Sequence, residues 1–152
     1  MSQDVEIKRF RFFVLPNNTT GSVSIPITRS PATTTLASLT RRSDCDSDSA
    51  VLLSATVGWV AITDGTGLDR VDVLFKIWRG APVTGTLIFS ADDSGESGFD
   101  SRKVTSFSHV DTRFDFRSSK PPTYFLTAEL PDTGSVATVI GPITFTATEF
   151  EI

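Results

Sequence analysis

The chain has few of the side chains that most enzymes use. Its 152 residues include one His, one Cys and one Tyr. A single His and a single Cys do not supply the four ligands of a structural zinc site. No G-x-S-x-G sequence is present, although His109 and Asp111 are expected to share one face of a strand with Ser106 or Ser108 nearby. We therefore expect a protein that is not an enzyme and that needs no cofactor.

The chain also lacks a strong excess of charge and any long apolar segment. Its formal net charge is -4, with both signs interspersed, so no field attracts nucleic acid or anionic lipid. Lys8, Arg9 and Arg11 are close in sequence, but a strand would divide them between its two faces. No stretch approaches the roughly 18 apolar residues of a membrane span, and the polar residues 1–4 do not resemble a secretion signal. We expect neither nucleic acid nor a membrane as partner, and synthesis in a cytosol.

What the chain does contain is a series of short β-branched and aromatic runs separated by Gly, Pro, Asn and Asp. The strongest runs cover residues 5–15, 50–62, 71–79, 123–130 and 136–152. Pro26 has no N–H to donate, which places a second strand at a sheet edge or a bulge. No helical period of any length appears. The pattern predicts an all-β fold, a single jelly-roll sandwich of about 8–10 antiparallel strands, with Ser and Thr at ordinary solvent-facing positions.

The first strand is apolar on both faces. Phe10, Phe12, Phe13, Val14 and Leu15 lie within six residues. A strand of this kind must be covered, either by its own second sheet or by another subunit through strand addition. Docking in a neighbour would be a head-to-tail contact, which gives rings or open filaments when it repeats. We therefore treat residues 1–16 as a strand or arm that can dock on a neighbouring subunit and residues 17–152 as the jelly-roll domain.

Two acidic segments are the candidates for a calcium site, since hard cations take oxygen ligands. Asp44, Asp46 and Asp48 alternate as at the start of a calcium-binding loop, but the later glycine and glutamate of such a loop are missing. Asp92 and Asp93 begin the segment 92–103, which is rich in Ser, Gly and acidic residues and is predicted to be a mobile surface loop. A solvated loop is the better explanation of these segments, so we predict no metal site and keep the five aspartates as weak calcium candidates.

Cys45 has no partner within the chain. It is either a tolerated surface cysteine or an intermolecular cross-link. The neighbouring carboxylates are expected to hold up the pKa of its thiol and to slow its reactions.

The two tryptophans are predicted to face opposite ways, with Trp59 inward and Trp78 outward. Trp78 with Phe99 or Tyr124 would make a platform on which a sugar ring stacks. Alternatively, Trp78 covers a neighbouring strand or lies in a subunit interface.

Four segments carry a resemblance to a known family. They are LLSATVGW at 52–59, VLFKIWRG at 73–80, YFLTAEL at 124–130 and VIGPITFTA at 139–147. Together with shorter stretches near residues 25 and 36, they are similar to the exosporium protein C-type proteins of endospore-forming Bacillota, over roughly residues 21–150. The resemblance implies a jelly roll related to tumour-necrosis-factor and C1q heads, a role on the spore surface, and synthesis in the mother cell without a signal peptide. Related spore appendages are cross-linked through cysteines on an N-terminal arm, whereas Cys45 is internal, so packing or strand exchange fits this chain better.

The leading hypothesis is a non-enzymatic structural subunit that self-assembles into an exosporium or coat layer or fibre. Its partners would be copies of itself and other spore-surface proteins. The predicted assembly interface consists of residues 10, 12, 13, 14 and 15 together with Trp78. The alternative is a ligand-binding β-sandwich module, a trimeric head that recognises carbohydrate or depends on calcium.

Overall fold

The computed structural model describes residues 5–40, 49–62, 70–97, 102–112, 123–132 and 134–151. In these ranges the chain forms strands and turns, and no helix in them is long and apolar enough to cross a bilayer. The strands are β1 (Glu6–Val14), β2 (Ile25–Pro26), β3 (Thr34–Thr40), β4 (Ser49–Ile62), β5 (Arg70–Arg79), β6 (Thr86–Glu96), β7 (Arg102–Asp111), β8 (Thr123–Glu129) and β9 (Val136–Glu151).

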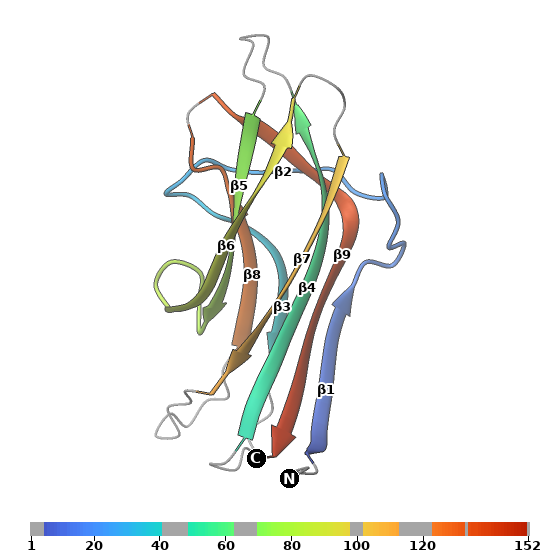
Figure 1. The fold of residues 1–152 in the computed structure, drawn as a ribbon, viewed down its shortest axis with the longest axis vertical. Helices are drawn as coiled ribbons and strands as arrows, with labels where there is room; N and C mark the ends of the chain where they lie inside the picture. The colour runs from blue at the N-terminus through green and yellow to red at the C-terminus, as the bar shows by residue number, and fades with distance from the viewer. Residues whose placement is uncertain are drawn as a thin grey trace.

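The strands form two antiparallel sheets that pack face to face (Figure 1). One sheet has the order β1-β9-β4-β7, with β2 also paired to β9, and the other has the order β3-β8-β5-β6. The pairings are nested along the chain, β1 with β9, β3 with β8, β4 with β7 and β5 with β6, as in one long hairpin wrapped around a core. This is the jelly-roll arrangement, so the predicted fold class is confirmed.

The core lies between the two sheets and is filled by every second side chain of the long strands. Trp59, Phe75 and Phe145 are 0% exposed. The inward orientation predicted for Trp59 and for alternate residues of β5 is confirmed. Because successive strand residues point to opposite faces, the remaining side chains of each strand form the two outer surfaces of the sandwich.

Strand β9 bends in its middle, and two glycines make the bend possible. Gly141 has a φ of 90°, which a residue with a side chain rarely adopts. Opposite it on β4, a Cβ at Gly58 would lie 2.0 Å from the carbonyl oxygen of Gly141. The β4–β9 register shifts here, between Val57 and Trp59. As a result one half of β9 pairs with β1 and the other half with β2 (Figure 1).

Both strands next to β9 on that side are edge strands. Strand β1 pairs with β9 of its own chain from Glu6–Glu151 to Val14–Thr144, with a register shift between Ile7 and Arg9. It is therefore an element of the sandwich in this structure. Strand β2 contains Pro26 and lies at the edge, as its missing N–H predicts.

The prediction of a surface loop over residues 92–103 is wrong for residues 92–96 and for residues 102 and 103, which begin β7. Residues 92–96 continue β6 and pair with β5, from Asp92 opposite Leu74 to Glu96 opposite Arg70. A glycine within the run has a packing reason, because a Cβ at Gly95 would approach the Trp59 ring to 3.1 Å. Residues 98–101 of the predicted loop lie outside the described ranges.

Candidate functional site

Over most of its described length, one outer surface of the sandwich carries uncharged side chains. The exposed Arg102 of β7 lies at one end of the same surface, in a row with Val60. The register of the β1-β9-β4-β7 sheet places Phe10, Thr148, Leu52 and Val110 in one row across its four strands. The neighbouring rows extend the same surface, which we call the neutral face. Its members are Ile7, Phe10, Phe12, Val14, Leu52, Ser54, Thr56, Val104, Ser106, Ser108, Val110, Thr144, Thr146, Thr148 and Phe150.

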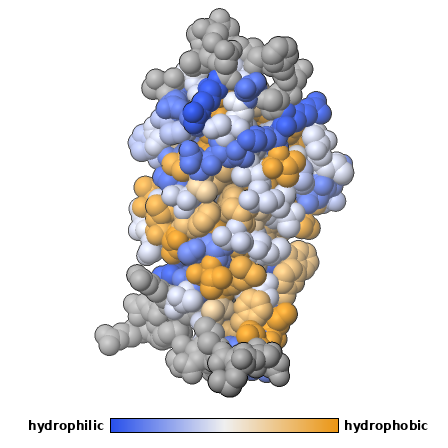
Figure 2. Space-filling view, viewed as in Figure 1, coloured by the Kyte–Doolittle hydropathy of each residue, from blue (hydrophilic) through white to orange (hydrophobic). Residues whose placement is uncertain are grey.

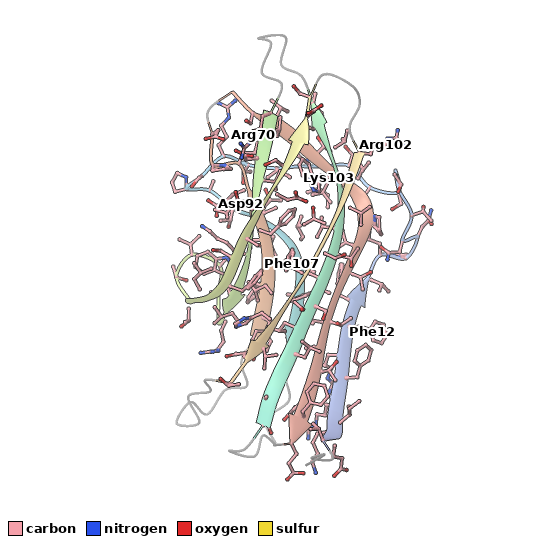
Figure 3. All side chains as sticks on the ribbon, viewed as in Figure 1. Phe12, Arg70, Asp92, Arg102, Lys103 and Phe107 are labelled. Carbon is pink, nitrogen blue, oxygen red and sulfur yellow. The ribbon has the colours of Figure 1, made fainter. Side chains whose placement is uncertain are left out.

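The apolar members of the neutral face lie mainly along its edges. On β1, Phe10, Phe12 and Val14 are 56%, 62% and 44% exposed, and on β7, Val104 and Val110 are 59% and 50% exposed. Figure 3 shows Phe12 projecting from β1 away from the sandwich. In Figure 2 apolar surface gathers over the part of the molecule where β1 and β9 run side by side in Figure 1. Large apolar side chains gathered on one surface are typical of a contact with another molecule.

Hydroxyl groups fill the middle of the neutral face. Thr144, Thr146 and Thr148 alternate along β9 and lie opposite Thr56, Ser54 and Leu52 of β4. Some of these groups bond to one another across strands, as Thr56 does with Ser106 at 3.0 Å between their hydroxyl oxygens. Asn18 also donates from its Nδ2 to Thr144 Oγ1, at 3.0 Å.

The outer surface of the second sheet has a different character, because it is charged and internally paired. Lys76 on β5 approaches Glu129 on β8 to 2.6 Å between Nζ and Oε1, and Glu129 is only 1% exposed. The Lys76 ammonium also lies 5.5 Å from the ring centroid of Trp78. The indole of Trp78 donates a hydrogen bond to Thr127 Oγ1 at 2.9 Å. Within the chain, these contacts pair the charges of Lys76 and Glu129 and provide an acceptor for the indole N–H of Trp78.

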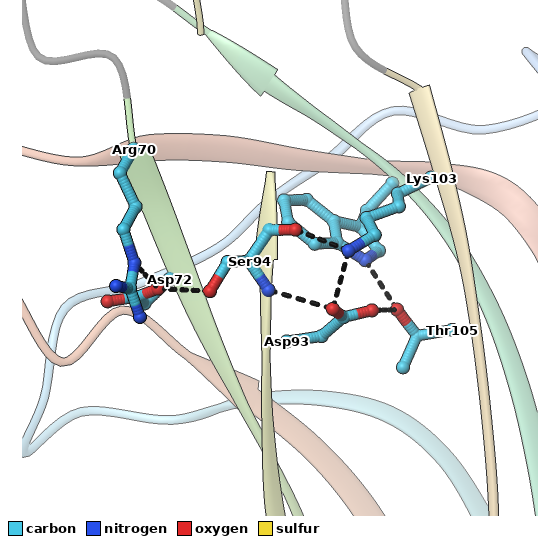
Figure 4. Close-up of polar contacts among 7 residues, drawn as sticks. Arg70, Asp72, Asp93, Ser94, Lys103 and Thr105 are labelled. Carbon is cyan, nitrogen blue, oxygen red and sulfur yellow. Dashed lines mark hydrogen bonds and ion pairs between the residues drawn. The ribbon is translucent and has the colours of Figure 1, made fainter. Parts of the chain in front are cut away.

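Polar side chains join the two sheets along the flank between edge strands β6 and β7 (Figure 4). Asp93 on β6 accepts hydrogen bonds from Lys103 Nζ at 2.6 Å and from Thr105 Oγ1 at 2.6 Å, both on β7. Lys103 also donates to the carbonyl oxygen of Ser94. The indole of the buried Trp59 donates to the same threonine hydroxyl, at 2.9 Å. This cluster fastens the edge of one sheet to the edge of the other.

The two carboxylates of this region have lowered pKa values. Burial raises the pKa of Asp93, but the hydrogen bonds from Lys103, Thr105 and the Ser94 amide together bring it below its usual range. Hydrogen bonds from Ser94 and then Arg70 lower the pKa of Asp72. Both groups therefore stabilise the folded state when they are ionised.

Farther along the same flank, the residues that a hydrolase would use serve as packing. His109 shares the inward face with Asp111, as predicted, but its ring lies 5.5 Å from that of Phe89. Asp111 is 3% exposed and accepts hydrogen bonds from Arg79 Nε at 3.0 Å and from the Tyr124 hydroxyl at 2.8 Å. Ser106 and Ser108 point to the opposite face of β7. A nucleophile beside the His–Asp pair is therefore not formed by these residues.

A small cavity lies on the other flank, between β1 and β3. Its volume is about 20 Å³, room for about one water molecule and too small for an organic ligand. It is lined by Arg9, Arg11, Leu39, Thr40, Val51, Tyr124, Ala147 and Glu149.

The structure divides the predicted assembly interface. Phe10, Phe12 and Val14 are on the neutral face, whereas Phe13 and Leu15 are half-buried and pack against the core. The period-two alternation of a strand places the two groups on opposite faces of β1.

Trp78 corrects two predictions. It occupies an outward position of β5, but it is only 7% exposed and so does not offer its ring to a partner. The platform with Tyr124 is wrong as well, because Tyr124 points into the core toward Asp111. Phe99, the other proposed member, lies outside the described residues.

The described residues also separate the calcium candidates. Asp92 and Asp93 are consecutive on β6, so they point to opposite faces, and Asp93 is occupied by Lys103. Within the described ranges no three His, Cys, Asp or Glu side chains are grouped so as to hold a metal ion. Asp44, Asp46, Asp48 and Cys45 lie outside those ranges.

No family model and no curated protein matches this sequence. Among solved structures, the chain is similar to part of the dimeric latent PorU of Porphyromonas gingivalis, with a TM-score of 0.52 and 15% identity over 93% of this chain. The match spans only 13% of the PorU chain.

Two weaker likenesses have TM-scores below one half. The structure of the infectious bursal disease virus Gx strain matches with a TM-score of 0.45 and 13% identity, covering 96% of this chain and 42% of that one. The CBM22-1 xylan-binding domain of Paenibacillus barcinonensis Xyn10C matches with a TM-score of 0.40 and 13% identity, covering 99% and 88% of the two chains. At these identities a likeness describes the fold alone, which here is a β-sandwich.

Proposed function

We propose that this protein is a non-enzymatic structural subunit that associates with copies of itself. The observation that supports this most strongly is the row of large apolar side chains that β1 exposes on the neutral face. Phe10 and Phe12 leave more than half of their surface in water, and their ring centroids are 5.9 Å apart. Removing such a side chain from water stabilises a contact by about 1.5–3 kcal/mol when burial is complete. In a single sandwich this apolar surface remains exposed to water, and in an assembly it would be buried.

The chemistry of the described residues supports the non-enzymatic part of the proposal. The carboxylates that are most buried are bonded to cations or hydroxyls, as Asp111 is to Arg79 and Tyr124. The imidazole of His109 packs on an aromatic ring. The cavity between β1 and β3 is of the size of a water molecule. These groups hold the two sheets together, and none of them is arranged around space for a substrate.

The place of assembly in this proposal comes from the sequence resemblance to exosporium protein C-type proteins. It assigns the subunit to a layer or fibre of the spore surface, the exosporium or coat, after synthesis in the mother cell. Other spore-surface proteins are then further partners.

Sedimentation velocity of the purified protein over a range of concentrations tests the proposal, with negative-stain electron microscopy of the same samples. We expect species larger than a monomer that grow with concentration and persist in reductant, because the contact is made by packing and not by a disulfide. A protein that stays monomeric at every concentration, with and without reductant, would contradict the proposal.

A further inference from the structure

We infer that two copies of this chain meet face to face, neutral face on neutral face, so that four sheets stack in one particle. The inference rests on the proposed self-association and adds which surface makes one of its contacts. Because a two-fold contact closes at two copies, a layer or fibre needs a second contact as well. It also specifies a two-fold arrangement, in which the same surface of both copies is used.

The first reason is the absence of charge on the neutral face. The sequence contains 14 Lys and Arg and 18 Asp and Glu, yet the rows of the neutral face hold none of them. Charge meets this outer surface at its end, where Arg102 of β7 lies one row beyond Val104. Solvent-facing sheet surfaces normally carry charged side chains, as the outer surface of the other sheet does with Lys76 and Asp72. The central part of protein interfaces is depleted in charge and enriched in aromatic residues. The neutral face shares this depletion of charge, and its aromatic residues lie along the edge formed by β1.

The second reason is that the neutral face is complementary to itself. In a two-fold contact the same surface patch lies on both sides of the interface. A row of carboxylates or of ammonium groups would therefore face groups of the same charge and be repelled. A Ser or Thr hydroxyl both donates and accepts a hydrogen bond, so Ser54 and Thr146 can pair with hydroxyls of a second copy. Apolar groups such as Phe12 likewise pack on one another. Because the whole chain has a net charge of -4, copies repel each other at their charged surfaces and least at this face.

The third reason is that the free edge of β1 is unsuited to pairing with a copy of itself. Within the described residues β1 pairs only with β9, so its other edge is open. That edge strand carries Lys8, Arg9 and Arg11 and a bulge between Ile7 and Arg9, the features by which edge strands avoid addition. With Phe10 opposite Phe10, antiparallel pairing of two β1 strands would set Arg9 of one copy beside Arg11 of the other. Stacking through the face avoids this contact.

The size of the neutral face is sufficient for a dimer. Four strands about 4.8 Å apart and about nine residues long at about 3.4 Å per residue cover roughly 600 Å². A standard interface buries about 800 Å² per partner measured over the rough molecular surface, which is of the same order.

A charge-reversal pair tests the inference at the middle of the face. Ser54 is central, between Thr146 on β9 and Ser108 on β7. We expect S54K alone and S54E alone to associate at least about tenfold more weakly than wild type, because each places like charges across the two-fold contact. Mixed in equal amounts, the two variants should associate again as heterodimers. The matched control is S38K with S38E, at an exposed position of β3 in the other sheet, which should leave association unchanged.

The outcomes separate this inference from the proposed function. If wild type associates but the Ser54 variants associate equally well, or the Ser38 variants are the ones that fail, the face-to-face contact is wrong and self-association stands. If the single Ser54 variants fail and their mixture does not recover, the contact includes this face but is not two-fold, which overturns the inference as stated. If wild type is monomeric, the proposed function fails and the inference with it. Circular dichroism of each variant confirms that it is folded before these comparisons are made.

Discussion

The rings of Phe10 and Phe12 stack on the solvent side of β1, with 5.9 Å between their centroids and 30° between their planes. The two residues are on the same face because they are two positions apart on a strand. Their stacking reduces the surface that each ring exposes, but both remain more than half exposed. A pair of this kind is a natural anchor for a partner, since aromatic side chains carry much of the binding energy of interfaces.

Replacing Phe12 by Ser should weaken self-association while leaving the fold intact. We expect the association constant to fall by about tenfold or more, because a buried aromatic contact of the dimer is lost. The free energy of unfolding should change by less than about 0.5 kcal/mol, since the ring is exposed in the single chain. Sedimentation velocity and urea unfolding measure the two quantities.

The control for that change is Leu87→Ser. Leu87 is 44% exposed on β6, in the other sheet, so the substitution removes a similar exposed apolar group away from the neutral face. Equal losses of association in both variants would mean that exposure alone, and not this face, drives the contact.

Replacing Gly58 by Ala should destabilise the whole sandwich. The added Cβ would lie 2.0 Å from the carbonyl oxygen and 2.5 Å from the carbonyl carbon of Gly141, both backbone atoms that a side-chain rotation cannot relieve. We expect the free energy of unfolding to fall by about 3 kcal/mol or more. At Gly21, which has a φ of 84° but open space around it, Ala should cost only about 1 kcal/mol. Equal free energies of unfolding for Gly58→Ala and Gly21→Ala would mean that β4 and β9 do not approach this closely at the bend.

Stability should fall in acid through Asp93. Its pKa is lowered in the folded state, so its contribution is fully present above the unfolded pKa of about 3.9 and is lost as pH falls through the folded pKa. Asp93→Asn should be less stable than wild type at neutral pH and should lose less additional stability below about pH 4. Lys103→Met removes a hydrogen-bond donor that lowers the pKa and should move the acid transition to higher pH. Thermal melts of wild type, Asp93→Asn and Lys103→Met at a series of pH values measure these differences. Melting temperatures that fall in parallel with pH in all three proteins would exclude the role given to Asp93.

The ion pair between Arg79 and Asp111 should matter more than the tyrosine that supports it. Asp111→Asn leaves the Arg79 guanidinium, whose side chain is 19% exposed, without its carboxylate partner, and we expect a loss of about 3 kcal/mol. Tyr124→Phe removes one hydrogen bond and should cost about 1 kcal/mol. Urea unfolding of both variants measures the two losses in the free energy of unfolding. A larger loss in Tyr124→Phe than in Asp111→Asn would contradict the prediction.

The sequence predicts the fold well because the core strands alternate regularly. The inward sides of β4 and β5, including Trp59 and Phe75, follow from this period alone. Residues 92–96 were misassigned because Asp, Ser and Gly are uncommon in strands. Here Asp93 is neutralised by Lys103 on another strand, and the absence of a side chain at Gly95 leaves room for an indole ring. These reasons lie in tertiary contacts that a local pattern does not contain.

The candidate site was only partly visible in the sequence for the same reason. The aromatic residues of β1 indicated a contact surface, and the alternation of Thr144, Thr146 and Thr148 was readable as a solvent-facing pattern. The neutral face, however, is a property of four strands side by side, and the order β1-β9-β4-β7 joins segments from both ends of the chain. Trp78 shows the converse case, because its outward position was predictable from parity but its cover by neighbouring side chains was not.

Cross-linking through the centre of the neutral face tests the central claim most directly. In a Cys45→Ser background, Thr146→Cys places the only thiol of the chain on β9 in the middle of that face, and Ser38→Cys places it on the other sheet. Stacked sheets are about 10 Å apart, within reach of a short bis-maleimide. We predict that the Thr146→Cys protein forms a covalent dimer and that the Ser38→Cys protein remains a monomer on a denaturing gel. Efficient dimer formation by the Ser38→Cys protein, with none by the Thr146→Cys protein, would show that the copies meet through another surface.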